Sequence, residues 1–400
     1  MPIITGVGRS HGIDAYEVGV LAAQEALSRL AGAPTGLVLL FASVAHDQQK
    51  VFAGVRAVVG PVPLVGCSTA GEITSAGPGE EASVVVMAVH GGSTASFAVG
   101  KAEGLMQGSE KAVGSTLAKS VLLAMNKKPL SGFFLFIDGL AGNAVDTLRG
   151  VSAVIGEEIP VLGGAAGDEF HFKETYQYYG DAVYTRAAVG VGISGDVHLG
   201  FGVRHGWGTI GVPLKATRSE GNVLYELDGK PAVAIYEKYF GITLDQLAGV
   251  GIAEVAVTYP LGFAVPGRDE LLIRDPISCD ERGALFCTAE IPQGVDVRLM
   301  IGSKDAALVA ATKAAEDAKL MLDGKTPRGL IVVDSMARKK LFGADGGEEI
   351  RAIQTVLGRD VPLVGFYAYG EIAPPGGQGE DGPGRQSIFH NETVVVIALA

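Results

Sequence analysis

The sequence predicts an α/β fold built from repeated modules of mixed sheets flanked by helices, with N- and C-terminal halves related by duplication. The first observation is a segment that runs from a proline through apolar residues to a glycine-bounded loop and an acid. It occurs at 63–73 and 362–372, and a looser copy lies at 160–168. A short apolar run closed by glycines is typical of a buried strand that ends in a tight loop.

The second observation is that similar elements surround each copy. One β-type run follows each loop, and another apolar run precedes it after a glycine. The following runs are 83–89, 187–193 and 393–399, and the preceding runs are 36–41, 132–137 and 329–333. Continuous apolar runs of this kind indicate strands that are buried on both faces.

Helical stretches complete each module. Apolar residues at spacings of three and four share one face in 20–30, 113–124 and 308–322, with Ser109 and Ser303 as expected N-caps of the last two. Shorter helices are expected at 47–59, 143–156 and 347–357. We therefore predict three modules, at 3–90, 95–193 and 295–399.

The stretch 200–290 breaks this pattern. Residues 217–231 indicate a hairpin, 232–240 a short helix, and Thr243 with Gln246 a capping box that begins another helix. Short strands at 271–273, 284–289 and 295–301 would complete a β-rich region. Near the end, the loop 374–384 is rich in proline, glycine and acids, and we expect a mobile flap or a spacer.

Composition narrows the class of protein. The 400 residues are 48% hydrophobic and 19% charged, so two or more domains with a large core are expected. A net charge of -12 without a basic stripe argues against nucleic-acid binding. Three cysteines form neither a disulfide framework nor a metal-ligand spacing. Without a signal peptide or a run of about 18 apolar residues, we expect a cytoplasmic protein with no membrane span.

This order of motifs resembles the FIST family of sensory domains, which have an N-terminal and a C-terminal part. The matching segments are 66–73, which reads Gly-Cys-Ser-Thr-Ala-Gly-Glu-Ile, and 219–232, 362–374 and 390–393. The resemblance divides the chain into an N-terminal domain (1–200), a joining segment (201–250) and a C-terminal domain (251–400). It implies a signal-transduction protein that binds a small ligand. Some members are described as haem-binding sensors of nitric oxide that work with histidine kinases or cyclic-di-GMP enzymes.

The chain departs from the family pattern after the run that ends in Val333. Ser335 stands where the family often has a cysteine, whereas Arg338 keeps the family's arginine. A thiol role at that point is therefore not expected. Arg338 would either clamp a carboxylate or phosphate through two hydrogen bonds or begin a solvated basic helix with its lysine neighbours.

The predicted ligand contacts come from Arg338 and the two best-preserved loops. They are Cys67, Ser68, Thr69 and Glu72 in the first loop, and Tyr367, Tyr369 and Glu371 in the last. Each has an alternative reading. The thiol is either a nucleophile or a buried core group. The acids, together with Asp168, either recognise a ligand or cap the backbone of their own loop. The aromatic side chains line a pocket or pack the core.

Haem would need an axial ligand, and histidine is the usual one. His205 is the first choice, because it lies among glycine and aromatic residues next to Arg204 and Trp207, and His198 and His390 follow. The alternative for each is a surface or hydrogen-bonded histidine. No Cys-x-x-Cys-His segment is present, so covalent attachment of haem is excluded.

These observations favour a cytoplasmic sensor that binds a small ligand, either haem or a metabolite such as an amino acid, in a cleft between its halves. We expect the signal to pass to a separate protein. The alternative is an enzyme, a hydrolase or transferase that uses Cys67 with Glu72 or Glu371. A third possibility is a scaffold that binds only another protein. Composition does not separate the three, and the resemblance favours the sensor.

Overall fold

The computed structural model describes residues 2–400 apart from 267, 269 and 376–385. The predicted flap at 374–384 therefore lies almost wholly outside the described residues. No helix among the described residues is both long enough and apolar enough to cross a membrane.

Three modules share one strand order. In each, the first and last strands pair antiparallel, the last strand pairs antiparallel with the second, and the second pairs parallel with the third. Module 1 contains β1 (Ile4–His11), β2 (Leu37–Ser43), β3 (Leu64–Thr69) and β6 (Ser83–His90). Module 2 contains β7 (Ser96–Glu103), β8 (Gly132–Ile137), β9 (Val161–Ala165) and β12 (Ala187–Ser194). Module 3 contains β13 (Leu199–Arg204), β22 (Gly329–Ser335), β23 (Leu363–Ala368) and β26 (Val394–Leu399).

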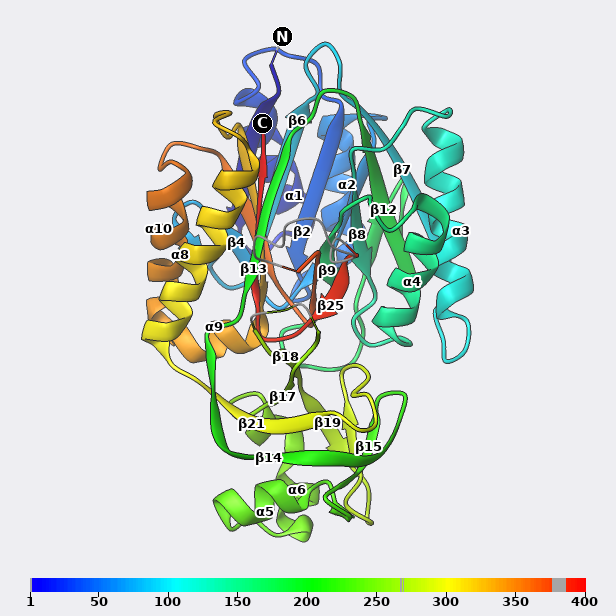
Figure 1. Cartoon of the computed structure of the whole chain (residues 1–400). Coiled ribbons are helices and arrows are strands. Elements are labelled where there is room, and N and C mark those ends of the chain that lie inside the picture. The colour runs from blue at the N-terminus through cyan, green and yellow to red at the C-terminus, as the bar shows by residue number, and fades with distance from the viewer. Residues whose placement is uncertain (1, 267, 269, 376–385) are drawn as a thin grey trace.

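Two helices cover the outer face of each sheet, as predicted (Figure 1). They are α1 (Ala15–Ser28) and α2 (Gln48–Val59), α3 (Glu110–Ala124) and α4 (Ala144–Ile155), and α8 (Lys304–Met321) and α10 (Gly346–Leu357). In module 3, α9 (Met336–Phe342) and a short 3-10 helix (Gly343–Asp345) precede α10. Ser303 accepts a hydrogen bond from the backbone N–H of Ala306, so the predicted N-cap is confirmed. Ser109 is likewise the N-cap residue of α3, as predicted, but its side chain makes no capping hydrogen bond.

The inner faces of the three sheets pack against one another. Phe41, Phe136 and Phe366, one from each module, meet with ring centroids 4.5 to 5.9 Å apart. Every residue of β2 is buried, because its outer side chains contact helices and its inner ones this shared core. The prediction of strands buried on both faces is confirmed.

A short hairpin leaves each module and extends the sheet of another. The hairpin of module 1, β4 (Glu72–Thr74) and β5 (Gly77–Pro78), joins the sheet of module 3. The hairpin of module 3, β24 (Glu371–Ala373) and β25 (Ile388–His390), joins the sheet of module 2. The hairpin of module 2, β10 (Gln177–Tyr179) and β11 (Ala182–Tyr184), joins the sheet of module 1. The exchange is cyclic. Each glycine loop is therefore a crossover between two sheets.

Residues 206–302 form an insertion within module 3, which lies below the three sheets in Figure 1. Its strands are β14 (Trp207–Glu220), β15 (Val223–Leu227), β16 (Lys230–Pro231), β17 (Leu261–Phe263), β18 (Leu272–Arg274), β19 (Pro276–Cys279), β20 (Leu285–Cys287) and β21 (Asp296–Gly302). Its helices are α5 (Ala234–Phe240), α6 (Leu244–Val250) and α7 (Ile252–Ala256). The predicted hairpin is confirmed by the antiparallel pair of β14 and β15, and the predicted capping box by Thr243 and Gln246.

One predicted boundary is wrong. Module 3 does not begin at residue 295, because β21 pairs with β14 and β17 inside the insertion. Its first strand is β13, which pairs with β26. Both segments are short apolar strands, and only the long-range pairing distinguishes them. The domain borders at 200 and 250 stay a prediction.

Candidate functional site

The first glycine loop locks modules 1 and 2 together. Ser68 donates from its hydroxyl to the carbonyl oxygen of Gly167 (2.8 Å) and accepts from the backbone N–H of Tyr176 (2.9 Å). Thr69 donates to a carboxylate oxygen of Glu72 (2.5 Å) and accepts from the N–H of Gly71 (3.0 Å). These side chains are buried, so the structure shows contacts within the protein. Their role as ligand contacts stays a prediction.

The loop acids bind groups of the protein itself. Asp168 accepts hydrogen bonds from the backbone N–H groups of Phe172 and Lys173, 2.9 and 2.6 Å away, and so caps its own loop. Glu371 accepts from the N–H (3.1 Å) and the hydroxyl (2.7 Å) of Thr393. Burial raises the pKa of Glu371 well above its usual range.

Glu72 occupies the corresponding position in module 1. Besides the Thr69 hydroxyl, it accepts a hydrogen bond from the hydroxyl of Ser83. Burial raises the pKa of Glu72 to about 7. A carboxyl group with this pKa exchanges its proton near neutral pH.

Cys67 lies on the inner face of β3 in the shared apolar core. Burial, with a smaller contribution from Glu72, raises the pKa of this thiol well above its usual value. The thiolate is the nucleophilic form of cysteine. The structure therefore offers no support for an enzyme that uses Cys67.

The two tyrosines have different surroundings. Tyr367 is buried, and the ammonium group of Lys339 lies 5.5 Å from its ring centroid. Tyr369 donates from its hydroxyl to Asp168 and accepts from the N–H of Phe170 (3.0 Å), while its ring stacks on Phe172. Tyr367 therefore packs in the core. For Tyr369, both interpretations stay open: it either packs in the core or lines a pocket.

Arg338 is fully buried, so the prediction of a solvated helix start is wrong. Its guanidinium pairs with Asp334 (3.1 Å) and Glu349, and it donates to the backbone carbonyl of His205. The arginine thus clamps carboxylates, but those of the protein itself. This clamp also ties α9 to the residue that follows β13.

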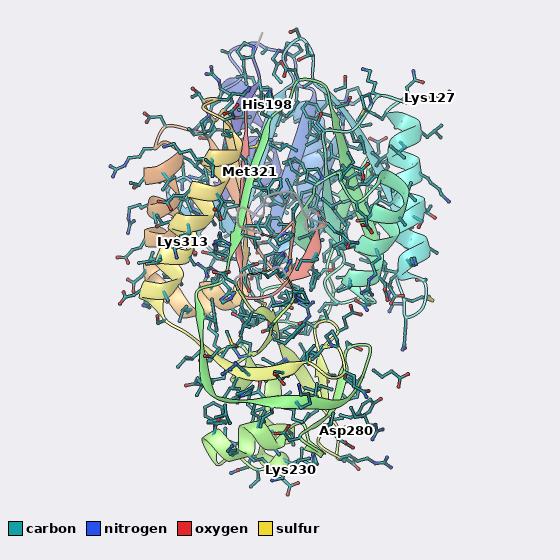
Figure 2. The ribbon with its side chains drawn as sticks, in the orientation of Figure 1. Lys127, His198, Lys230, Asp280, Lys313 and Met321 are labelled. Carbon is teal, nitrogen blue, oxygen red and sulfur yellow. The ribbon has the colours of Figure 1, made fainter. Side chains whose placement is uncertain are left out.

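The structure brings two of the three predicted histidines together and leaves the third apart. His205 and His390 both line a cavity of about 30 Å³ between module 3 and the insertion. His198 is half exposed and lies 3.1 Å from Asp196. Figure 2 shows His198 at the opposite end of the molecule from the insertion, where Lys230 and Asp280 lie.

The cavity combines charged walls with an apolar one. Module 3 contributes Val203, Arg204, His205, Pro375, His390 and Thr393, and the insertion contributes Arg268, Glu270, Leu271, Leu272 and Ile273. Arg204 is paired with Asp317 (2.6 Å). Burial lowers the pKa of Arg268 to about 10, so this guanidinium stays charged at neutral pH. The lining comes from residue 203 onward, so the predicted N-terminal domain (1–200) contributes no wall, whereas we expected a cleft between the halves.

The hydrogen bonds of His205 fix its tautomer. Its Nδ1 atom accepts from the backbone N–H of Trp207 (2.8 Å), so in the neutral ring the proton is on Nε2. Nε2 has no hydrogen-bond partner among the described residues and lies 3.8 Å from a carboxylate oxygen of Glu270. Burial lowers the pKa of His205 and keeps the ring neutral. The cavity thus contains an unused N–H donor.

Haem does not fit this site. A nitrogen that ligates iron must be unprotonated, but Nε2 of His205 carries the proton. His390 uses its Nε2 for the carbonyl of Ala373 (3.2 Å). The cavity is also far smaller than ligand pockets and carries several charged side chains, whereas a porphyrin needs a wide apolar slot.

Arg268 and Glu270 were missed in the sequence. They lie in a short charged segment between Pro266 and the apolar pair Leu271–Leu272. The feature of the sequence that could have identified them is this cluster of charged residues within a region of short apolar strands. It identified no site, because nothing in the sequence placed it opposite His205.

Comparisons with known proteins identify the family. Residues 36–230 match the model of the FIST N domain, and residues 232–374 match that of the FIST C domain. The chain belongs to the FIST family. FIST domains are sensory domains of signal transduction, so the coarse function is sensory.

The relatives include uncharacterised proteins of bacteria and archaea. A protein of Mycobacterium tuberculosis is 28% identical over 93% of this chain and 95% of its own length. One from Methanocaldococcus jannaschii is 26% identical over 56% of this chain and 43% of its own. Among solved structures, a cyanuric acid hydrolase of A. caulinodans covers 99% of each chain at 12% identity, with a TM-score of 0.36. A second cyanuric acid hydrolase structure has a TM-score of 0.38 at 10% identity, covering all of both chains. These TM-scores are too low to assign the fold or the activity of the two hydrolases to this chain.

Proposed function

We propose that this FIST protein is a cytoplasmic sensor that binds a small zwitterion, a molecule with one carboxylate and one amine such as an amino acid. The ligand would bind at the cavity between module 3 and the insertion, whose walls must separate to admit it because the space of about 30 Å³ holds only water. The observation that supports this is the pairing of two donors for a carboxylate, Arg268 and Nε2–H of His205, with one acceptor for an ammonium group, Glu270.

Each polar group has a partner in such a ligand. Arginine binds carboxylates through two parallel hydrogen bonds, and a buried N–H without a partner costs free energy that a ligand oxygen would recover. An ammonium group offsets the charge of Glu270. The apolar wall, which includes Val203 and Ile273, would accept an uncharged side chain.

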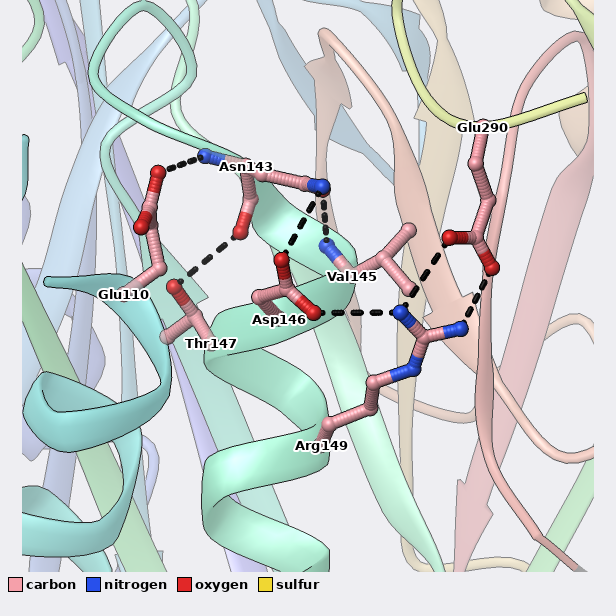
Figure 3. Close-up of polar contacts among 7 residues, drawn as sticks. All are labelled: Glu110, Asn143, Val145, Asp146, Thr147, Arg149 and Glu290. Atoms are coloured by element: carbon pink, nitrogen blue, oxygen red, sulfur yellow. Dashed lines mark hydrogen bonds and ion pairs between the residues drawn. The ribbon is translucent and has the colours of Figure 1, made fainter. Parts of the chain in front are cut away.

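The cavity is placed where a ligand could change the position of the insertion. Opposite walls belong to different parts of the fold, and closure around a ligand is a common way to transmit binding. The insertion is also tied to module 2: Arg149 of α4 pairs with Glu290 of the insertion and with Asp146 (Figure 3). Both ion pairs of Arg149 are partly exposed, so they cost little to rearrange.

A second connection runs from the cavity to module 1 through α9. Arg338 donates to the carbonyl of His205, and the neighbouring Lys339 donates to the carbonyl of Ala70 (2.7 Å) in the first glycine loop. We propose that this path passes the ligand signal to a surface read by a separate protein. The family resemblance suggests a histidine kinase or a cyclic-di-GMP enzyme as that partner.

Thermal unfolding with each proteinogenic amino acid at about 10 mM tests the proposal, because a ligand that binds only the folded state raises Tm. The best stabiliser is then titrated calorimetrically into wild type, Arg268→Ala and Glu270→Gln. Both variants are expected to bind at least about tenfold more weakly, the effect of one lost charged contact. Arg282→Ala, an exposed arginine of the same insertion, is the matched control and is expected to bind as wild type. Stabilisation by no amino acid, or unchanged binding by both variants, would exclude this site.

A further inference from the structure

Modules 1 and 3 place the same chemical groups at the same positions. In the parallel pairs, Gly66 lies opposite Leu40 and Gly365 opposite Val332, which aligns the two sheets. In the last strands, Val86 lies opposite Leu40 and Val396 lies opposite Val332. Three residues earlier in each strand, Ser83 is therefore equivalent to Thr393. The first strand then makes His11, which pairs with Ser83, equivalent to His205, which follows Arg204 at the end of β13.

The equivalent groups also make equivalent contacts. Ser83 donates its hydroxyl to the loop acid Glu72, as Thr393 does to Glu371. Nε2 of His11 lies 2.9 Å from a carboxylate oxygen of Glu80, as Nε2 of His205 faces Glu270. Each acid that faces the histidine comes from a different part of the fold. The hydroxyl and the loop acid occupy equivalent positions in both modules, whereas Glu80 follows β5 and Glu270 belongs to the insertion.

Module 2 lacks this set. The same count places Ala187 at the hydroxyl position and Glu103 at the histidine position, and these two residues pair with each other. The strand framework therefore does not itself require a histidine and a hydroxyl there. Their presence in modules 1 and 3 calls for another reason.

Module 1 has a cavity at this position. It has a volume of about 240 Å³ and is lined by Arg9, Ser10, His11, Glu25, Thr74, Gly79, Glu80, Ser83 and Val85. It is the counterpart of the cavity in module 3 without the covering insertion. This difference explains why the side chain of His11 is 58% exposed while that of His205 is 8% exposed.

We propose that the module 1 cavity is a second binding site for a small zwitterionic molecule. The inference rests on the same chemistry as the proposed function: among the lining residues Arg9 is the donor for the carboxylate, and Glu80, which lies 2.9 Å from Nε2 of His11, is the acceptor for the amine. Because these charges are exposed to water, their attraction is screened, and the site binds at least about tenfold more weakly than the covered one. Its larger volume accepts a larger side chain.

The test is a titration followed by NMR of protein labelled with ¹³C at the histidine ring Cε1. The probes are L-alanine, L-glutamate and L-arginine, each added separately up to about 10 mM, which detects millimolar affinity. The signals of His11 and His205 report the two cavities independently, and the signal of His198, which lines neither, is the control. We expect at least one probe to shift His11 saturably, and Arg9→Ala to weaken that response about tenfold while leaving any His205 response unchanged.

The outcomes separate the two sites. If no probe shifts His11, the second site is wrong, whatever His205 does. If His11 responds and His205 does not, the second site stands and the proposed function fails. An equal shift of His198 would mean non-specific binding and would overturn the proposal. Arg9 is exposed, so Arg9→Ala is expected to fold, and Glu80→Gln provides a second surface variant with the same expected loss.

Discussion

At the scale of single residues, Glu72 shows how burial changes the chemistry of a repeated acid. Both of its oxygens accept hydrogen bonds from hydroxyls, yet burial dominates and raises its pKa to about 7. The folded protein therefore holds this proton more tightly than the unfolded chain, whose carboxyl has the ordinary value of 4.5. The stabilisation is complete below about pH 4.5 and is lost as the pH rises to about 7.

This linkage predicts the behaviour of Glu72→Gln, which stays neutral at every pH. The free energy of unfolding of the variant minus that of wild type should rise by about 3 kcal/mol between pH 4.5 and pH 8. Urea denaturation at several pH values measures it. Glu281→Gln, at an exposed position in the insertion, is the control variant. A pH-independent difference for Glu72→Gln would mean that Glu72 ionises normally in the folded protein.

Residue identity suggested two of the residues that line the cavity, although as haem ligands, a role that stays a prediction. His205 and His390 were chosen from the sequence, and they line one cavity. Their chemistry was not predictable, because the tautomer of His205 depends on a hydrogen bond from Trp207 that only the turn after β13 produces. Arg268 and Glu270 were not predictable either, since they reach His205 across a contact between the insertion and module 3.

At the scale of elements, the third residue of β3 and of β23 shows why the repeat contains a glycine. A Cβ atom at Gly66 would lie 1.8 Å from the carbonyl oxygen of Leu40, and at Gly365 2.2 Å from that of Val332. Real atoms do not approach so closely, so the strands would have to separate. The glycine is therefore needed for strand pairing and says nothing about a ligand.

Gly66→Ala is accordingly expected to lower the free energy of unfolding by about 3 kcal/mol or more, within the range of severe backbone and packing defects. Gly208→Ala is the matched control, because the nearest atom to its Cβ would be 4.0 Å away, and a change within about 0.5 kcal/mol is expected. Urea unfolding of both variants makes the comparison. Equal stabilities of the two variants would show that the sheet adjusts to a methyl group at position 66.

The pattern of apolar residues predicted most elements but not their partners. Helices and buried strands follow from local periodicity. The start of module 3 does not, because β13 and β21 are both short apolar strands, and the chain leaves the module after the first and returns after the second. The crossover of β4, β10 and β24 into neighbouring sheets was equally invisible, since edge pairing depends on contacts far apart in sequence.

At the scale of the whole molecule, the three modules form one body because each gives a hairpin to another. The shared core and the cyclic exchange leave no module with a complete sheet of its own. The insertion differs, because its apolar core contains residues of the insertion itself apart from the partly buried Ile388. This organisation predicts that the insertion can be removed, whereas no module can.

The connection in module 1 shows how to remove it. There, His11 is followed by Gly12, Ile13 and the N-cap Asp14 of α1. Deleting residues 208–302 would leave His205 followed by Gly206, Trp207 and the N-cap Ser303 of α8, the same number of residues. The ends already lie together, because Trp207 pairs with Gly302. The shortened chain would therefore join without moving β13 or α8.

We expect this deletion variant to fold cooperatively, with the helices and the three sheets retained, but with lower stability because it removes Arg274, which donates to the carbonyl oxygen of Phe389, and Thr288, which donates to Asn391. Circular dichroism and urea unfolding measure both properties. In the histidine NMR titration the variant should lose any response of His205, because Arg268 and Glu270 are gone, and keep that of His11. A variant without a cooperative transition would show that the insertion is part of the folding core. A retained His205 response would place the ligand wholly within module 3.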